Sequence, residues 1–180
     1  MDDSYRQKAL EARRKVLHMV HKARTSHIAS NFSVIDIATV LYDNLEEGDE
    51  VVWSKGWAAA TIYYFLAQQG KIPVEDLDKF PEPPYIGLAE TTVNGVLCNG
   101  GAVGHGTPIA TGMAIGKLKK QSPGTVFCIL SDGELNEGTV WESVNMASHM
   151  KLGNLVFIVD ANKWQAMGRT VDVCAIPAKK

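Results

Sequence analysis

Three absences in the sequence narrow the possible functions before any motif is considered. No run of about 18 consecutive apolar residues occurs, which is the length that a membrane-spanning helix needs. The N-terminal segment is too polar for a secretory signal peptide. The three cysteines, Cys98, Cys128 and Cys174, are far apart and lack the close spacing of zinc sites or disulfide frameworks. We therefore expect a cytoplasmic protein that neither spans a membrane nor is secreted.

An excess of basic charge is also missing. The chain has 18 Lys and Arg against 20 Asp and Glu, so its formal net charge is -2. Proteins that bind nucleic acid through its phosphates usually carry a basic patch, so we expect no nucleic-acid partner. The chain has 180 residues, and 46% of them are hydrophobic, which is typical of a globular protein. This length predicts a single domain over 1–180 with one hydrophobic core.

The hydrophobic pattern alternates between helical and strand-like segments. Apolar residues three and four positions apart predict amphipathic or buried helices, whereas short continuous apolar runs predict strands covered on both faces. A glycine-rich turn starting at Gly100 feeds one of these helices, and a turn is expected over 25–30. The expected helices are 4–23, 33–42, 57–69, 74–80, the later part of 100–118, and 137–150, and the expected strands are 51–53, 125–130 and 154–159.

The last two strands are joined by a helix, so they should lie parallel with a right-handed crossover. Ser131, Asp132 and Gly133 follow the first of these strands, and Asn162 follows the second shortly after its end. Because ligands bind at the carboxyl ends of parallel strands, both groups should face one rim of the sheet. Carboxylate and amide oxygens are ligands that Mg²⁺ accepts alongside water and phosphate oxygens. The alternative is that Asp132 and Asn162 are ordinary turn residues.

The residues around Asp132 also suit a phosphate group. Gly133 has no Cβ, so its backbone can approach a ligand closely, and the following helix offers free N–H groups at its start. Glu134 and Glu137 do not fit a purely anionic ligand. Their presence is explained if a cation binds nearby or if they belong to an interface.

Several segments resemble one enzyme family. The run from Ser131 through Asn162 resembles the G-D-G…N signature of thiamine-diphosphate enzymes, with serine in place of the first glycine, and 131–168 is very similar to transketolases, especially those split into two subunits. Three upstream segments agree in the same order. Residues 25–28 are similar to the S-G-H-P-G turn, 53–56 to the S-K-G-H-A segment, and 101–106 to the G-P-L-G-Q-G loop.

The resemblance implies a three-layer α/β fold, in which a mostly parallel sheet has helices on both faces. It implies that thiamine diphosphate binds with Mg²⁺, or with Ca²⁺ or Mn²⁺, and that Asp132, Asn162 and the backbone carbonyl of Trp164 hold the metal. The implied cofactor-binding residues are Gly101, Ala102, Val103, Gly104, Ser131, Asp132, Gly133, Glu134 and Asn162. The implied function is transfer of a two-carbon ketol unit between sugar or sugar-phosphate substrates.

The catalytic candidates are His27, His105 and Glu137. By resemblance, His27 lines the substrate channel and Glu137 is a subunit-interface glutamate coupled to the partner's active site, while His105 lies in the cofactor loop. Each has a structural alternative. His27 can serve as a helix-cap or turn residue, His105 can pack against the loop backbone, and Glu137 can interact favourably with the dipole of its helix.

The sequence departs from the family pattern at several places. Trp57 stands where the family has the histidine of S-K-G-H, Ile28 replaces a proline, and His105 replaces a glutamine. No G-H-P motif occurs between Lys79 and Glu90. By the same resemblance, we expect a domain that is shortened at its C-terminus and a pyrimidine-binding domain that a partner subunit supplies, in a homodimer or a heterotetramer.

These departures leave two alternative functions open. One is a catalytically reduced cofactor-binding or assembly module. The other is a related enzyme that acts on another ketol or 2-oxo acid donor.

Overall fold

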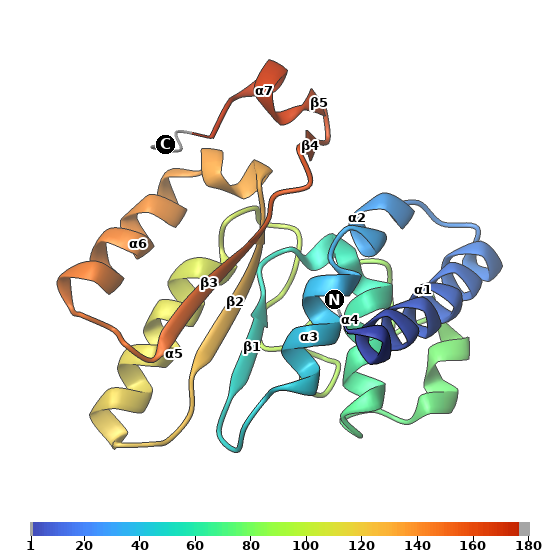
Figure 1. Ribbon diagram of the computed structural model, residues 1–180, viewed down its shortest axis with the longest axis horizontal. Helices are drawn as coiled ribbons and strands as arrows, with labels where there is room; N and C mark the ends of the chain where they lie inside the picture. Colours follow the sequence, from blue (N-terminus) through green and yellow to red (C-terminus); the bar gives the residue numbers. More distant parts are fainter. Residues whose placement is uncertain (1, 177–180) are drawn as a thin grey trace. The chain divides into compact units, whose positions relative to one another are not determined.

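The computed structural model describes residues 2–176 (Figure 1). Its internal contacts divide the chain into two units. Unit 1 comprises 2–45 and 56–101, and unit 2 comprises 46–55 and 102–176. Both units therefore contain residues from separate parts of the sequence. The sequence-based expectation of one domain over 1–180 stays a prediction.

A parallel three-stranded sheet forms the centre of unit 2. Its strands are β1 (Glu50–Trp53), β2 (Val126–Ser131) and β3 (Leu155–Asp160), in the order β1-β2-β3. Both neighbouring pairs are parallel, which confirms the α/β fold and the parallel pairing of the two later strands. Helix α5 (Gly106–Lys120) packs against β2, and α6 (Gly138–His149) packs against α5. Burial of the apolar β2 residues Val126, Cys128, Ile129 and Leu130 stabilises this arrangement.

The register of the sheet sets where the polar loops begin. Ser131 at the end of β2 is paired with Asp160 at the end of β3, so the loops that carry Asp132 and Asn162 leave the sheet at the same edge. The N–H of Lys55, just after β1, donates to the carbonyl of Ile129 at 3.1 Å. The three strands therefore end close together, and their polar residues gather at one rim, as the sequence predicts.

Unit 1 is helical. It contains α1 (Asp3–Ala23), α2 (Ile28–Phe32), α3 (Ile35–Asp43) and α4 (Ala59–Gln68), with the 3-10 turns η1 (Gly56–Ala58) and η2 (Val74–Lys79). The apolar stripe of α1 packs on α3 and α4. Arg13 of α1 forms a bidentate ion pair with Asp36 of α3, with 2.9 Å between Nη1 and Oδ1 and 2.6 Å between Nη2 and Oδ2. The largest buried side chains of this unit are Met19, Ile35, Ile62, Tyr63 and Leu77.

Some local expectations from the sequence are wrong. Ser33 does not start a helix over 33–42, because a separate short helix, α2, already begins at Ile28 within the expected turn. Hydrogen bonds from the backbone N–H and the side-chain amide of Asn31 to the His27 carbonyl hold that first turn together. The acidic segment at 74–79 is a 3-10 turn.

The segment after β3 also contains elements that the sequence pattern did not predict. They are the short antiparallel pair β4 (Trp164–Gln165) and β5 (Gly168–Arg169), followed by α7 (Thr170–Val173). Elements of two to four residues are too short for hydrophobic periodicity to reveal. Within residues 2–176, no helix combines the length and the apolar character needed to cross a bilayer.

Candidate cofactor site

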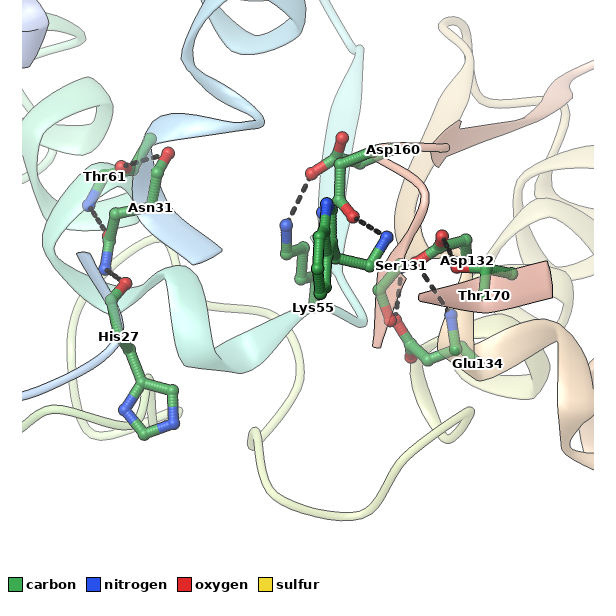
Figure 2. Close-up of polar contacts among 12 residues, drawn as sticks. His27, Asn31, Lys55, Thr61, Ser131, Asp132, Glu134, Asp160 and Thr170 are labelled. Carbon is green, nitrogen blue, oxygen red and sulfur yellow. Dashed lines mark hydrogen bonds and ion pairs between the residues drawn. The ribbon is translucent and has the colours of Figure 1, made fainter. Parts of the chain in front are cut away.

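Asp132 is the central residue of the strand-end site in unit 2. Its side chain is buried, with 1% of its surface exposed. One carboxylate oxygen, Oδ1, accepts a hydrogen bond from the Gly133 N–H at 3.0 Å, and Oδ2 accepts one from the Thr170 hydroxyl (Figure 2). Among residues 2–176, no Lys, Arg or His forms an ion pair with this carboxylate. A buried negative charge that contacts only neutral donors is costly, and a bound cation would offset that cost.

Asn162 lies two residues beyond β3 and is half-buried. Its side-chain oxygen accepts a hydrogen bond from the Trp164 N–H at 2.7 Å, which is the geometry of an Asx turn. Trp164 itself begins β4, and its indole is largely exposed. The turn fixes the path of the backbone from Asn162 to Trp164, the two residues that the family resemblance assigns to the metal together with Asp132.

Glu134 lies two residues after Asp132, in the 3-10 turn η3 (Gly133–Asn136), and its side chain is also buried, with 2% exposed. Its carboxylate accepts hydrogen bonds from the Ser131 N–H at 2.7 Å, the Ser131 hydroxyl at 3.1 Å and the Gly104 N–H at 3.0 Å. It also accepts one from the Ser54 hydroxyl. Glu134 therefore connects the ends of β1 and β2 to the glycine loop, residues 101–106.

A buried ion pair also lies at this rim, and the sequence pattern did not predict it. Lys55, which follows β1, contacts Asp160 at the end of β3, with 2.5 Å between Nζ and Oδ2 (Figure 2). Their side chains are only 7% and 5% exposed. The available signal was a lysine two residues after a short apolar strand and an aspartate directly after the apolar run 154–159. Nothing in the spacing of the two residues indicated that they would meet.

The glycine loop depends on glycine at two of its positions in unit 2. Gly104 has a φ of +82°, and a Cβ there would lie 2.9 Å from the Thr139 hydroxyl oxygen. A Cβ at Gly106 would come within 2.4 Å of the Cβ of Ser54. Ala102 and Val103 are exposed, whereas Gly104 is buried. The loop therefore packs Gly104 against Glu137 and Thr139 at the start of α6 and Gly106 against Ser54 after β1, and it presents Ala102 and Val103 to solvent.

His105 and Glu137 are both exposed and precede helices of unit 2. His105 lies directly before α5, and its backbone N–H donates to the Ala102 carbonyl at 3.2 Å. Glu137 lies directly before α6, and its backbone N–H donates to the Glu134 carbonyl at 3.0 Å. Exposed imidazole and carboxylate groups are available to bind a ligand or a second chain, so the assigned catalytic roles stay predictions.

His27 belongs to unit 1, where it forms a stacked pair with Trp57. Their ring centroids are 4.4 Å apart and the ring planes are 15° from parallel. His27 has a φ of +71°, and its Nδ1 is 2.7 Å from the Ser26 hydroxyl oxygen. The side-chain amide of Asn31 donates to its carbonyl at 2.9 Å (Figure 2). The rings of His27 and Trp57 are both exposed, so an aromatic surface stands where the resemblance places two histidines.

The chemistry of the donor set at Asp132 suits a magnesium diphosphate. No group of three or more His, Cys, Asp or Glu side chains placed to bind a metal occurs in the described part of the chain. An ion at Asp132 would therefore need amide, carbonyl, water or phosphate oxygens as well, which is how Mg²⁺ is usually bound beside a phosphate substrate. The buried Asp132 carboxylate, which forms no ion pair within residues 2–176, and the oxygens of the loop that leaves β3 at the same edge of the sheet are the kinds of ligand that fit that requirement.

Comparisons with known proteins identify relatives across the whole chain. The family described as "Transketolase, thiamine diphosphate binding domain" matches residues 5–176. One relative, a subunit of the apulose-4-phosphate transketolase of Actinobacillus succinogenes, is 34% identical, over 99% of this chain and 70% of its own length. The 6-deoxy-6-sulfo-D-fructose transketolase subunit SqwG of a Clostridium species is 29% identical, over 89% of this chain and 63% of its own length.

Solved structures agree with this result. The crystal structure of transketolase from Campylobacter jejuni superposes with a TM-score of 0.86 and 25% identity, over 96% of this chain. The chain spans 30% of that longer protein. The match therefore concerns one part of a larger enzyme, the part that contains the sheet and strand-end residues described above.

Proposed function

The chain belongs to the transketolase family as a thiamine-diphosphate-binding domain, and from this membership we propose that it is one subunit of a ketol transferase. The proposed reaction moves a two-carbon ketol unit between sugar or sugar-phosphate substrates. The observation that carries the proposal is Asp132, a buried carboxylate with no ion-pair partner among residues 2–176 at the carboxyl end of a parallel sheet. Bound thiamine diphosphate would supply the carbanion stabilisation that such a transfer needs.

The proposed metal ligands are Asp132, Asn162 and the backbone carbonyl of Trp164, with Mg²⁺ as the ion and Ca²⁺ or Mn²⁺ as substitutes. Asp132 Oδ1 and Oδ2 each receive one hydrogen bond from a neutral group, which leaves further lone pairs on both oxygens. The Asx turn at Asn162 restricts the backbone that would present the Trp164 carbonyl. Ser131 and Gly133 flank Asp132 and are proposed to lie beside the diphosphate.

The remaining site residues have proposed roles in binding and proton transfer. The backbone of Gly101, Ala102, Val103 and Gly104 would contact the cofactor. His27 would orient a substrate hydroxyl, and the exposed imidazole of His105 is a second candidate donor. Glu137, exposed at the start of α6, would face a second chain.

A partner subunit is part of the proposal. The relatives in Actinobacillus and Clostridium are named as transketolase subunits, and this chain spans 70% and 63% of their lengths. As the partner we propose a C-terminal, pyrimidine-binding transketolase subunit, in a heterotetramer, with a homodimer of this chain as the simpler assembly. The proposed location is the cytoplasm.

Titration calorimetry with thiamine diphosphate and Mg²⁺ tests the site. We expect binding that requires the metal, and Asp132→Ala should weaken it by at least about 100-fold because the metal loses its charged ligand. The control is Asp43→Ala, which removes an exposed carboxylate that pairs with Lys8 on the surface of unit 1. Equal binding by the wild type and Asp132→Ala, with and without the partner subunit, would contradict the proposal.

The stacked Trp57 favours one alternative, a subunit that binds the cofactor with reduced catalytic activity. An indole stands there in place of an imidazole, and because an indole can only donate a hydrogen bond, a group that could accept one or transfer a proton is lost. Turnover assays with the partner subunit present distinguish this reduced module from an active ketol transferase. Cofactor binding without ketol transfer from sugar phosphates would favour the reduced module, and transfer from other ketols or from 2-oxo acids would favour a related enzyme with a different donor.

A further inference from the structure

We propose that Glu134 is a positioning residue, which holds the backbone of the cofactor-binding glycine loop in its binding conformation before the cofactor binds. The inference rests on the proposed function, because the loop is taken to contact thiamine diphosphate. It assigns Glu134 a role distinct from direct cofactor contact, since its carboxylate oxygens are used within the protein. Glu134 would act through the backbone of Gly104 and through Ser54.

The Glu134 carboxylate accepts four hydrogen bonds. Oε1 accepts from the Ser54 hydroxyl and from the Gly104 N–H at 3.0 Å, and Oε2 accepts from the N–H and hydroxyl of Ser131 at 2.7 and 3.1 Å. All four donors are neutral, and the side chain is 2% exposed. Both carboxylate oxygens are therefore occupied by contacts within the protein.

Ser54 connects Glu134 to a second N–H group of the glycine loop. While its hydroxyl donates to Glu134, its oxygen accepts a hydrogen bond from the Gly106 N–H at 3.1 Å. Gly106 is the first residue of α5, where backbone N–H groups have no partner within the helix. Glu134 therefore holds the loop at Gly104 directly and at Gly106 through Ser54.

Gly104 and Gly106 of the loop are closely packed. Gly104 has a left-handed φ, and a Cβ there would lie 2.9 Å from the Thr139 hydroxyl oxygen. A Cβ at Gly106 would come within 2.4 Å of the Cβ of Ser54. The two N–H groups consequently point at fixed acceptors in a tightly packed region. Pre-ordering of a binding loop lowers the entropic cost of ligand binding, so loss of these acceptors should reduce cofactor affinity.

The test uses the full chain and two readouts. Amide hydrogen exchange at Gly104 and Gly106 is measured without cofactor, and the dissociation constant for thiamine diphosphate is then measured at saturating Mg²⁺. Glu134→Gln presents an NH₂ group to one pair of donors, so we expect exchange at Gly104 to rise at least about tenfold relative to Ile129 in β2. The cofactor dissociation constant should rise by about tenfold or more.

Ser54→Ala is the second variant, and it keeps the test decisive if Glu134→Gln does not fold. It should raise exchange at Gly106 more than at Gly104, because it removes the relay and leaves the direct contact. Glu47→Gln makes the same chemical change at an exposed site in unit 2 and should alter neither readout.

The outcomes separate this inference from the proposed function. If exchange in the variants is unchanged, rises equally at Ile129, or rises without a change in cofactor affinity, Glu134 is not a positioning residue. If the wild type fails to bind thiamine diphosphate while exchange at Gly104 still responds to Glu134→Gln, the proposed function is wrong and the loop contact stands.

Discussion

The two units present their candidate site residues by different physical means. In unit 2 the charged groups at the strand ends are buried, and each carboxylate is held by specific donors, as at Asp132, Glu134 and Asp160. In unit 1 the His27 and Trp57 rings are exposed and contact each other by stacking. Buried charges tolerate few substitutions because each lost partner leaves a costly unpaired group, whereas an exposed stack can change residue at low cost. This difference fits a sequence that departs from the family at Trp57 but retains Asp132 and Asn162.

Lys55→Met should have the largest effect on stability, because it removes a cation that contacts Asp160 in buried surroundings. We expect a loss of about 3–5 kcal/mol in the free energy of unfolding. Urea denaturation measures it. The matched control is Lys8→Met in unit 1, whose pair with Asp43 is exposed and should contribute about 0–1 kcal/mol. Equal losses of unfolding free energy in Lys55→Met and Lys8→Met would contradict the expectation that the buried ion pair contributes more than the exposed one.

Asn31→Ala should have an intermediate effect within unit 1. The Asn31 side-chain oxygen accepts from the Thr61 N–H at 2.8 Å in the first turn of α4, and its amide donates to the His27 carbonyl. Loss of both partners in a buried position should cost about 1–3 kcal/mol, measured by urea denaturation. Asn44→Ala, at an exposed position, is the control. A cost below that of the control would show that His27 is not anchored through Asn31.

Trp57→Ala should have a smaller effect, because it removes an exposed stack. We expect a loss of about 0.5–1.5 kcal/mol and a more mobile His27 ring, measured by denaturation and by NMR relaxation of the ring. Trp57→Phe keeps an aromatic face and should retain most of the order at His27. If His27 is equally ordered in Trp57→Ala, the stack does not orient it.

The smallest effect concerns Tyr85 of unit 1 and appears only at high pH. A hydrogen bond from its hydroxyl to Asp76, together with burial, raises the pKa of Tyr85 from 10.0 to about 12. The folded state therefore favours the protonated phenol. Its contribution to stability is complete below pH 10.0 and is lost as the pH rises through about 12.

Urea denaturation of the wild type and Tyr85→Phe, at about pH 9 and about pH 11, tests this dependence. The wild type should lose more stability between the two values than the variant does. Parallel losses in the two proteins would show that the Asp76 contact does not affect the titration of Tyr85.

Sequence patterns predicted the parallel pair of β2 and β3 and the rim that carries its polar residues, but they did not place β1 beside β2. The continuous apolar runs at β2 and β3, separated by one helix, favour a parallel crossover, and this predicted that Asp132 and Asn162 follow strands that end at one edge. The contacts that complete the site were not predictable. Lys55 meets Asp160 across 105 residues, and Thr170 meets Asp132 across 38. Such pairs depend on tertiary packing, and a single sequence contains no periodic signal for them.

The four hydrogen bonds at Glu134 have a consequence for protein engineering. They join Ser54, Gly104 and Ser131, which belong to three separate stretches of the chain. A designer who transplants only the contiguous segment 131–168 into another scaffold would leave out two of the three stretches. The smallest portable version of this site is therefore discontinuous: it includes the end of β1, the glycine loop and a segment extended to Thr170, whose hydroxyl contacts Asp132.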